Sequence, residues 1–183
     1  MKLPVYIAEQ MQERLASLTV DCDYARTFYQ RMPREIDVEA RWKLSLEVLY
    51  RLFFCSLIVP GHYRRKINIL RSENVSRKLL QDCKGYLLLL AETDPESVHI
   101  EDYVVWQEWD LCIGEMGKEL LRKHQIFDSN SALSNDFIAD IEKLFSEKGV
   151  GWDDAPLLKN KGIDSRRMVG LSLARYRKCN AHG

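Results

Sequence analysis

An arginine and a histidine close to the C-terminus are the residues of this chain best suited to chemistry. Arg177 and His182 stand in the sequence ARYRKCNAHG. RNA can be cleaved without a metal when a base removes the proton of the ribose 2′-hydroxyl and a cation stabilises the charge on the phosphorane oxygens. Histidine suits the first task because its ordinary pKa lies near neutrality, and arginine suits the second because its planar guanidinium donates paired hydrogen bonds to phosphate. The two residues predict a metal-independent acid–base site.

The spacing of these residues on a helix indicates how such a site would be arranged. Arg177 and His182 are separated by about 140° around a helix and flank one broad face. Arg175 lies on the same face as His182, so either arginine could lie beside the imidazole. One histidine is half of an acid–base pair. A two-fold dimer that places this helix beside its copy would supply the second histidine.

The same residues resemble a known signature. An Arg, a few intervening residues and a His that continues as Ala-His-Gly looks like the motif of the HEPN superfamily, and the stretch KGIDSRRMVGLSLARYRKCNAHG is similar to the end of some bacterial HEPN-like proteins. Members include ribonuclease toxins of toxin–antitoxin pairs, abortive-infection proteins and nuclease domains of CRISPR effectors. The resemblance implies one helical domain over residues 1–183, a homodimer, a cognate antitoxin or partner protein, and cleavage of RNA to a 2′,3′-cyclic phosphate.

The resemblance also assigns roles to individual residues. Arg177 and His182 match the catalytic positions, and Asn180 is a polar helper. Further polar side chains near the motif are candidates for substrate binding: Arg175, Lys178, Asn180, Arg166 and Arg167. No cofactor is implied.

Other chemistries lack the residues they need. Cys179-x-x-His182 is a single ligand pair without a second pair to complete a zinc site. Glu96-x-x-His99 has the spacing of a di-iron ligand pair, but no other histidine follows a glutamate at that spacing. Phosphate-binding loops, dinucleotide fingerprints and the GxSxG elbow are absent from the sequence. No metal is therefore expected.

Charge is balanced overall but not locally. The chain has 27 Lys and Arg against 27 Asp and Glu. Residues 159–183 contain seven basic residues and one acid, residues 64–84 contain seven basic residues and two acids, and residues 92–119 contain nine acids and one basic residue, Lys118. These runs are either ordinary solvated helix faces or acidic and basic helices that pair within the monomer. Alternatively, the two basic runs form a surface that binds phosphates.

Two alternatives to the nuclease follow from these patterns. A non-catalytic interaction protein, such as an immunity protein or adaptor, would use an acidic helix 92–119 with Trp106 and Trp109, although such a stripe is also typical of a core or a protein–protein seam. A degenerate HEPN module would bind RNA or nucleotide without cutting it.

The elements that would position the motif are expected to be helices. Periodic apolar residues predict helices over 5–30, 39–59, 64–92, 97–125, 135–148 and 166–182, with a long loop between the last two. The helix over 64–92 is either continuous or broken into two pieces around residue 72. Asp37, Ser134 and Asp164 or Ser165 are suitable N-caps, and Gly149 is a suitable C-terminal glycine. The expected fold is all-α, an antiparallel bundle of about five to seven helices.

Composition supports a globular chain with its thiols reduced. The 183 residues are 46% hydrophobic and 30% charged, which is typical of one folded domain. The five cysteines are odd in number and widely spaced, a pattern that favours packed thiols over a disulfide framework. No signal peptide or membrane span is apparent, so we expect a cytoplasmic protein.

Overall fold

The computed structural model describes residues 3–63, 83–96, 106–107 and 109–152. Their helices and strands, in chain order, are α1 (Val5–Ser17), β1 (Asp23–Tyr24), α2 (Ala25–Gln30), α3 (Val38–Phe54), β2 (Ile58–Tyr63), α5 (Cys83–Glu92), β3 (Trp109–Ile113), α7 (Glu115–Lys123) and α8 (Asn135–Glu147). The described chain is mainly helical, in line with the sequence. The three strands correct the prediction of an all-α fold.

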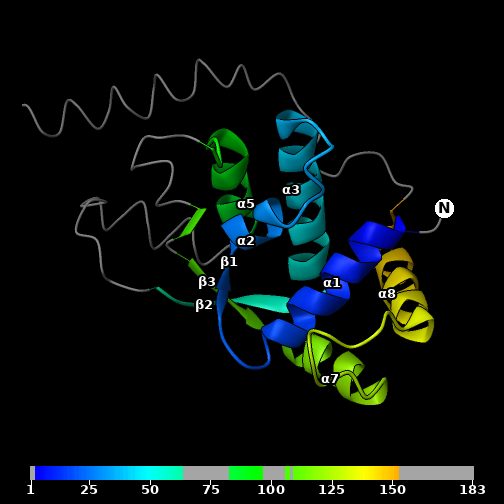
Figure 1. Cartoon of the computed structure of the whole chain (residues 1–183). Coiled ribbons are helices and arrows are strands. Elements are labelled where there is room, and N and C mark those ends of the chain that lie inside the picture. Colours follow the sequence, from blue (N-terminus) through cyan, green and yellow to red (C-terminus); the bar gives the residue numbers. More distant parts are fainter. Residues whose placement is uncertain (1–2, 64–82, 97–105, 108, 153–183) are drawn as a thin grey trace, which may run out of the picture.

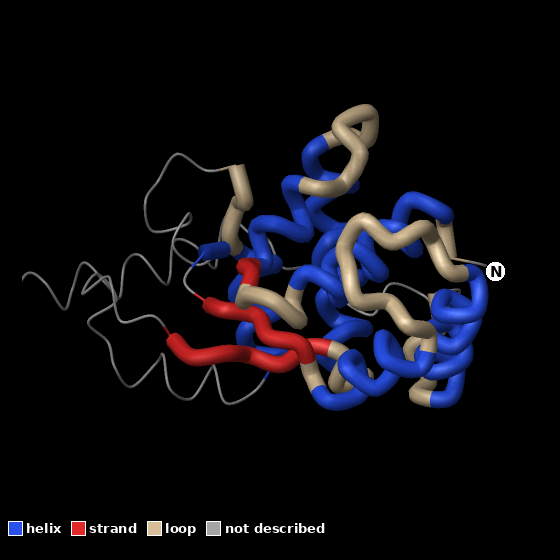
Figure 2. The backbone as a smooth tube through the Cα atoms, turned by 60° about the horizontal axis from the view of Figure 1, so that its bottom comes forward, coloured by secondary structure: helices blue, strands red, loops and turns tan. Residues whose placement is uncertain are grey.

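The strands form one small antiparallel sheet in the order β1-β3-β2. Figure 2 shows them together on one side of the helices. In β3, Leu111 pairs with Asp23 of β1 on one side and with Pro60 of β2 on the other. Proline cannot donate to a ladder, and β2 is an edge strand in which this missing donor is tolerated.

The strand β3 overturns the prediction of a continuous helix over 97–125. Residues 109–113 are extended and interrupt the helical residues, which in the described part of this region are 106–107 and Glu115–Lys123. Leu111 and Ile113 are buried because alternate side chains of a strand share one face. The turn into α7 requires a glycine, since a Cβ on Gly114 would lie 2.1 Å from the carbonyl oxygen of Ser56.

Helices α3, α7 and α8 end in the same hydrogen-bonding motif. In each, a residue with positive φ follows the helix: Ser56 and Gln125 at 56° and Gly149 at 69°. The next amide reaches back over the last turn, as in the 2.9 Å bond from Ile126 N to Leu121 O. This is the Schellman ending, which satisfies carbonyls left open at a helix C-terminus. The prediction that Gly149 ends its helix is confirmed. Helix α3 ends at Phe54, before the predicted limit at residue 59.

Replacing Gln125 with glycine is expected to stabilise the fold by about 0.5–1 kcal/mol. A side chain in the left-handed region costs about 1–2 kcal/mol, and the extra freedom of glycine in the unfolded chain offsets part of this gain. Gln125 is exposed, so little packing is lost. Urea unfolding checks the result. The matched control Gln125→Ala keeps the Cβ, and an equal gain in that variant would contradict the explanation.

The core lies between the helices and one face of the sheet. The predicted apolar face of the first helix is confirmed, because Ile7, Met11, Leu15 and Leu18 are buried. However, the expected helix over 5–30 is divided by β1 into α1 and α2. Helix α5 packs against α3 and α7 against α8, while α8 lies alongside α1 (Figure 1).

Two predicted helix caps are present. Asp37 Oδ1 accepts from Ala40 N at 3.0 Å, and Ser134 Oγ accepts from Phe137 N at 3.3 Å. These contacts start α3 and α8 where the sequence predicted. Of the helix expected over 64–92, α5 confirms residues 83–92, and residues 64–82 lie outside the described residues. Residues 97–105, the expected helix over 166–182, most of the loop before it and the proposed cap at residue 164 or 165 also lie outside them.

Candidate functional site

The predicted catalytic pair and its helpers all lie outside the described residues. They belong to the range 153–183 and comprise Arg177, His182, Arg175, Lys178, Asn180, Arg166 and Arg167. The structure therefore neither brings these side chains together nor separates them. The described residues do show how the chain is held at residues 150–152 and which contacts His124 and Trp106 make.

A buried arginine holds the chain immediately before that segment. Arg51 of α3 donates from Nε to Val150 O at 2.9 Å and from Nη2 to Gly151 O at 3.1 Å. Its guanidinium lies over the Trp152 ring, 4.5 Å from the ring centre. Glu47, one turn earlier on α3, accepts from Nη1 at 2.6 Å. Residues 150–152 are thus fixed to α3, 14 positions before Arg166, the first of the predicted site residues.

Among the described histidine side chains, His124 is held in an ion-pair cluster. Its Nε2 lies 2.7 Å from Asp140 Oδ2, and Lys123 Nζ donates to the same oxygen at 2.6 Å. The hydrogen bonds from Lys123 and then His124 lower the pKa of the Asp140 carboxyl. An imidazole oriented by a carboxylate is suited to acid–base chemistry. Here the imidazole lies edge-on to Phe137 and links the end of α7 to α8. These contacts give His124 a structural role.

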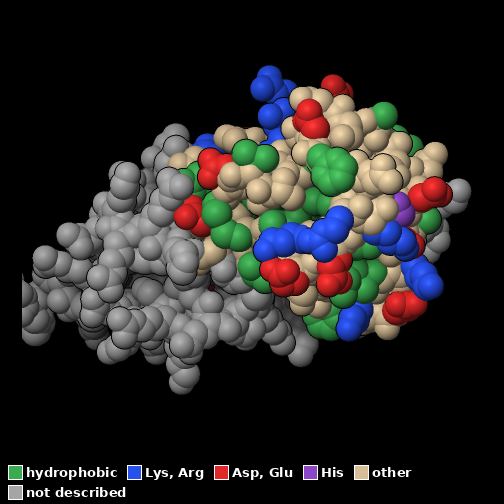
Figure 3. Space-filling view, turned by 90° about the horizontal axis from the view of Figure 1, so that it is seen from below, with side chains coloured by type: hydrophobic (Ala, Val, Ile, Leu, Met, Phe, Trp, Pro, Cys, Tyr) green, Lys and Arg blue, Asp and Glu red, His purple; other side chains and the backbone are tan. Residues whose placement is uncertain are grey.

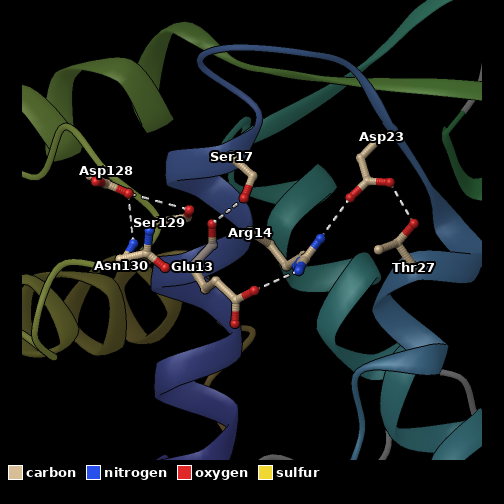
Figure 4. A network of polar contacts seen from close by, with 8 residues as sticks. All are labelled: Glu13, Arg14, Ser17, Asp23, Thr27, Asp128, Ser129 and Asn130. Atoms are coloured by element: carbon tan, nitrogen blue, oxygen red, sulfur yellow. Dashed lines mark hydrogen bonds and ion pairs between the residues drawn. The ribbon is translucent and has the colours of Figure 1, made fainter.

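A second polar cluster connects α1 with the start of the sheet. Arg14 is buried, donates to Asp23 Oδ2 at 2.9 Å, and donates to Glu13 Oε1 at 2.6 Å (Figure 4). Thr27 Oγ1 donates to the other oxygen of Asp23 at 2.5 Å. Asp23 is the first residue of β1, so these contacts set the position of that strand. This cluster was not predicted from the sequence. The feature that could have indicated it is Arg14, a charged residue on the apolar face of a helix.

The acidic helix of the adaptor interpretation does not exist as a continuous element. Helix α5 ends at Glu92, and β3 interrupts the described part of the acidic run. Trp106 is fully buried and donates from Nε1 to Thr93 O at 2.7 Å. Its ring packs against Tyr29, whose hydroxyl donates to Glu96, and burial raises the pKa of Tyr29. Trp106 is therefore a core residue and is not available to a partner.

The face shown in Figure 3 is mixed in charge, with basic and acidic side chains close together among apolar ones. This face does not offer phosphate a uniformly basic surface. Exposed ion pairs among the described residues include Lys118 with Glu115 at 2.6 Å and Lys43 with Glu39 at 2.5 Å.

The described residues contain neither a metal-binding cluster nor a membrane-spanning helix. No group of three or more His, Cys, Asp or Glu in them is arranged to hold a metal ion. None of their helices has the length and apolar character needed to cross a bilayer.

Comparison with known proteins gives no family assignment. No protein-family model, curated protein or solved structure matches this chain. The function therefore has to be argued from the residues themselves.

Proposed function

We propose that this chain is a metal-independent RNA endonuclease of the HEPN kind that acts as a cytoplasmic toxin or defence effector. The observation that carries the proposal is the C-terminal sequence in which Arg177 precedes His182 among basic residues. The predominance of helices in the described residues is consistent with a helical nuclease domain. The small sheet is an addition to the bundle that the resemblance implies.

The proposed reaction needs only groups that the chain carries. A His182 imidazole removes the 2′-hydroxyl proton of ribose, and the resulting oxygen attacks the adjacent phosphorus. The bond from phosphorus to the 5′-oxygen breaks, and a second imidazole, from the other copy in a homodimer, returns a proton to that oxygen. Arg177 donates to the phosphorane oxygens during the attack. The products are a 2′,3′-cyclic phosphate and a free 5′-hydroxyl.

Substrate binding is assigned to the same segment. Arg166, Arg167, Arg175 and Lys178 would contact the RNA backbone, with Asn180 as a hydrogen-bonding helper. The face in Figure 3 mixes basic and acidic side chains, whereas 159–183 holds seven basic residues against one acid, the concentration of charge that a phosphate backbone requires.

The purified chain is expected to cleave single-stranded RNA in the presence of EDTA. The readout is the product end, a 2′,3′-cyclic phosphate detected by mass spectrometry. An oligonucleotide of the same sequence with 2′-deoxyribose at every position is the matched control, and it should survive because the nucleophile is missing.

Three results would contradict the proposal. Cleavage that EDTA abolishes would indicate a metal enzyme, and equal cleavage of the deoxy control would exclude attack by the 2′-hydroxyl. Binding that weakens steeply with salt, without any product, would identify a module that binds RNA but does not cut it.

A further inference from the structure

Two cysteines far apart in the sequence, Cys22 and Cys112, lie opposite each other where β1 pairs with β3. Because Asp23 pairs with Leu111 and Tyr24 with Asp110, the next position of the antiparallel ladder sets Cys22 opposite Cys112. Their sulfur atoms lie 2.8 Å apart, compared with about 2.05 Å in a disulfide. Both are free thiols and both are partly exposed. The sequence predicted reduced, packed thiols, and Cys22, Cys55 and Cys112 are free; Cys55 is buried, whereas Cys22 and Cys112 are only partly buried.

The surrounding residues hold the two sulfurs in this arrangement. Asp23, directly after Cys22, is fixed by Arg14 and Thr27, and the Cys22 amide donates to Asp21 Oδ1 at 2.8 Å. On the neighbouring strand β2, a Cβ at Gly61 would lie 2.6 Å from Cys112 Sγ. The glycine therefore leaves the space that the Cys112 sulfur occupies.

The two thiols are not equivalent. Burial and the contact with Cys22 raise the pKa of the Cys112 thiol to about 11. A thiolate is the attacking species in thiol–disulfide exchange. Cys22 lies directly before the two-residue edge strand β1, whereas Cys112 lies in the central strand β3. We therefore expect the exchange to start at Cys22, with Cys112 reacting second.

We propose that Cys22 and Cys112 form a dithiol site that reacts reversibly with low-molecular-weight disulfides. The Cys22 thiolate attacks one sulfur of a disulfide RSSR, which forms a mixed disulfide and releases the first thiolate RS⁻. Cys112 then loses its proton and attacks the Cys22 sulfur, which forms the Cys22–Cys112 bond and releases the second RS⁻. Both thiol protons end on the two RSH molecules, so the protein is oxidised by two electrons and RSSR is reduced.

The bond would tie a weak strand to the centre of the sheet. Strand β1 has two residues and pairs only with β3. The bond would join residues that are 90 positions apart. Closing so long a loop restricts the unfolded chain strongly, and we expect Tm to rise by on the order of 10 °C.

Incubation of the full chain with oxidised glutathione tests the proposal. The remaining thiols are then alkylated, and mass spectrometry of the peptides locates each cysteine. We expect a Cys22–Cys112 cross-link, a higher Tm, and reversal of both by dithiothreitol. Cys112→Ser should retain one glutathione on Cys22 because the second thiol is missing. Cys55→Ala, which removes a buried thiol elsewhere, should cross-link like the unmodified chain.

The cross-links and alkylated cysteines of the unmodified chain test the proposal even if a variant fails to fold. A glutathione adduct that persists on wild-type Cys22, or alkylation of both Cys22 and Cys112 after oxidation, would overturn the proposal. So would a cross-link that joins either residue to a different cysteine. The outcome does not depend on whether the chain cleaves RNA.

Discussion

Replacing His182 with alanine is expected to lower the rate of RNA cleavage by about 10²–10⁴-fold. Alanine cannot accept the 2′-hydroxyl proton, and in a homodimer the change removes the imidazole from both copies at once. The initial cleavage rate of a fluorescent RNA at saturating enzyme measures the loss. RNA affinity should change far less than the rate, because the seven basic residues of 159–183 are left in place to bind the phosphates.

The control for this variant is another histidine. His99→Ala removes an imidazole outside the motif and should cleave RNA at the rate of the unmodified chain. Arg177→Ala should also lose activity, because the charge on the phosphorane is then uncompensated. Measuring the rate and the RNA affinity of this variant at two salt concentrations separates a loss of catalysis from weaker binding. Full activity of the His182 variant would refute the assignment.

Replacing Arg51 with methionine is expected to lower the free energy of unfolding by about 3–5 kcal/mol. The arginine is 2% exposed and donates to the backbone carbonyls of Val150, Gly151 and Glu47 and to the Glu47 carboxylate. Methionine keeps the apolar stem but removes every donor, so a half-buried carboxylate loses its cation and the carbonyls of residues 150 and 151 lose this partner. The stacking over Trp152 is lost as well. Denaturant unfolding followed by circular dichroism gives the measurement.

A salt bridge of the same spacing on the same helix provides the control. Lys43 pairs with Glu39 across four residues of α3, as Arg51 does with Glu47, but the Lys43 and Glu39 side chains are 56% and 71% exposed. Lys43→Met should change stability by less than about 1 kcal/mol, because water screens an exposed pair. Similar losses in the two variants would show that burial of Arg51 is not the source of its effect.

The features that the sequence predicted correctly depend on neighbours in the chain. Asp37 and Ser134 cap helices because a side-chain oxygen reaches an amide three residues later. Gly149 ends α8 because glycine adopts positive φ without a steric penalty. Each of these is a local choice, and the residue type alone carries enough information to predict it.

The missed features depend on contacts between distant segments. Ser56 and Gln125 adopt the same positive φ as Gly149, but neither is a glycine, so the sequence did not mark the ends of α3 and α7. Residues 109–113 lie within an amphipathic pattern that also fits a helix. They are extended because β1 and β2 supply hydrogen-bond partners on both sides.

The sequence by itself determined that the chain folds mainly as helices and where several of them start, and it supplied the C-terminal candidates on which the proposed RNA cleavage rests. Those properties follow from side-chain type and short-range periodicity. Only the tertiary structure decided that a sheet replaces part of a predicted helix, that Arg51 anchors residues 150–152, and that Cys22 meets Cys112. These pairings join residues about a hundred positions apart, and their energy comes from burial and hydrogen bonds that exist only once the chain has folded.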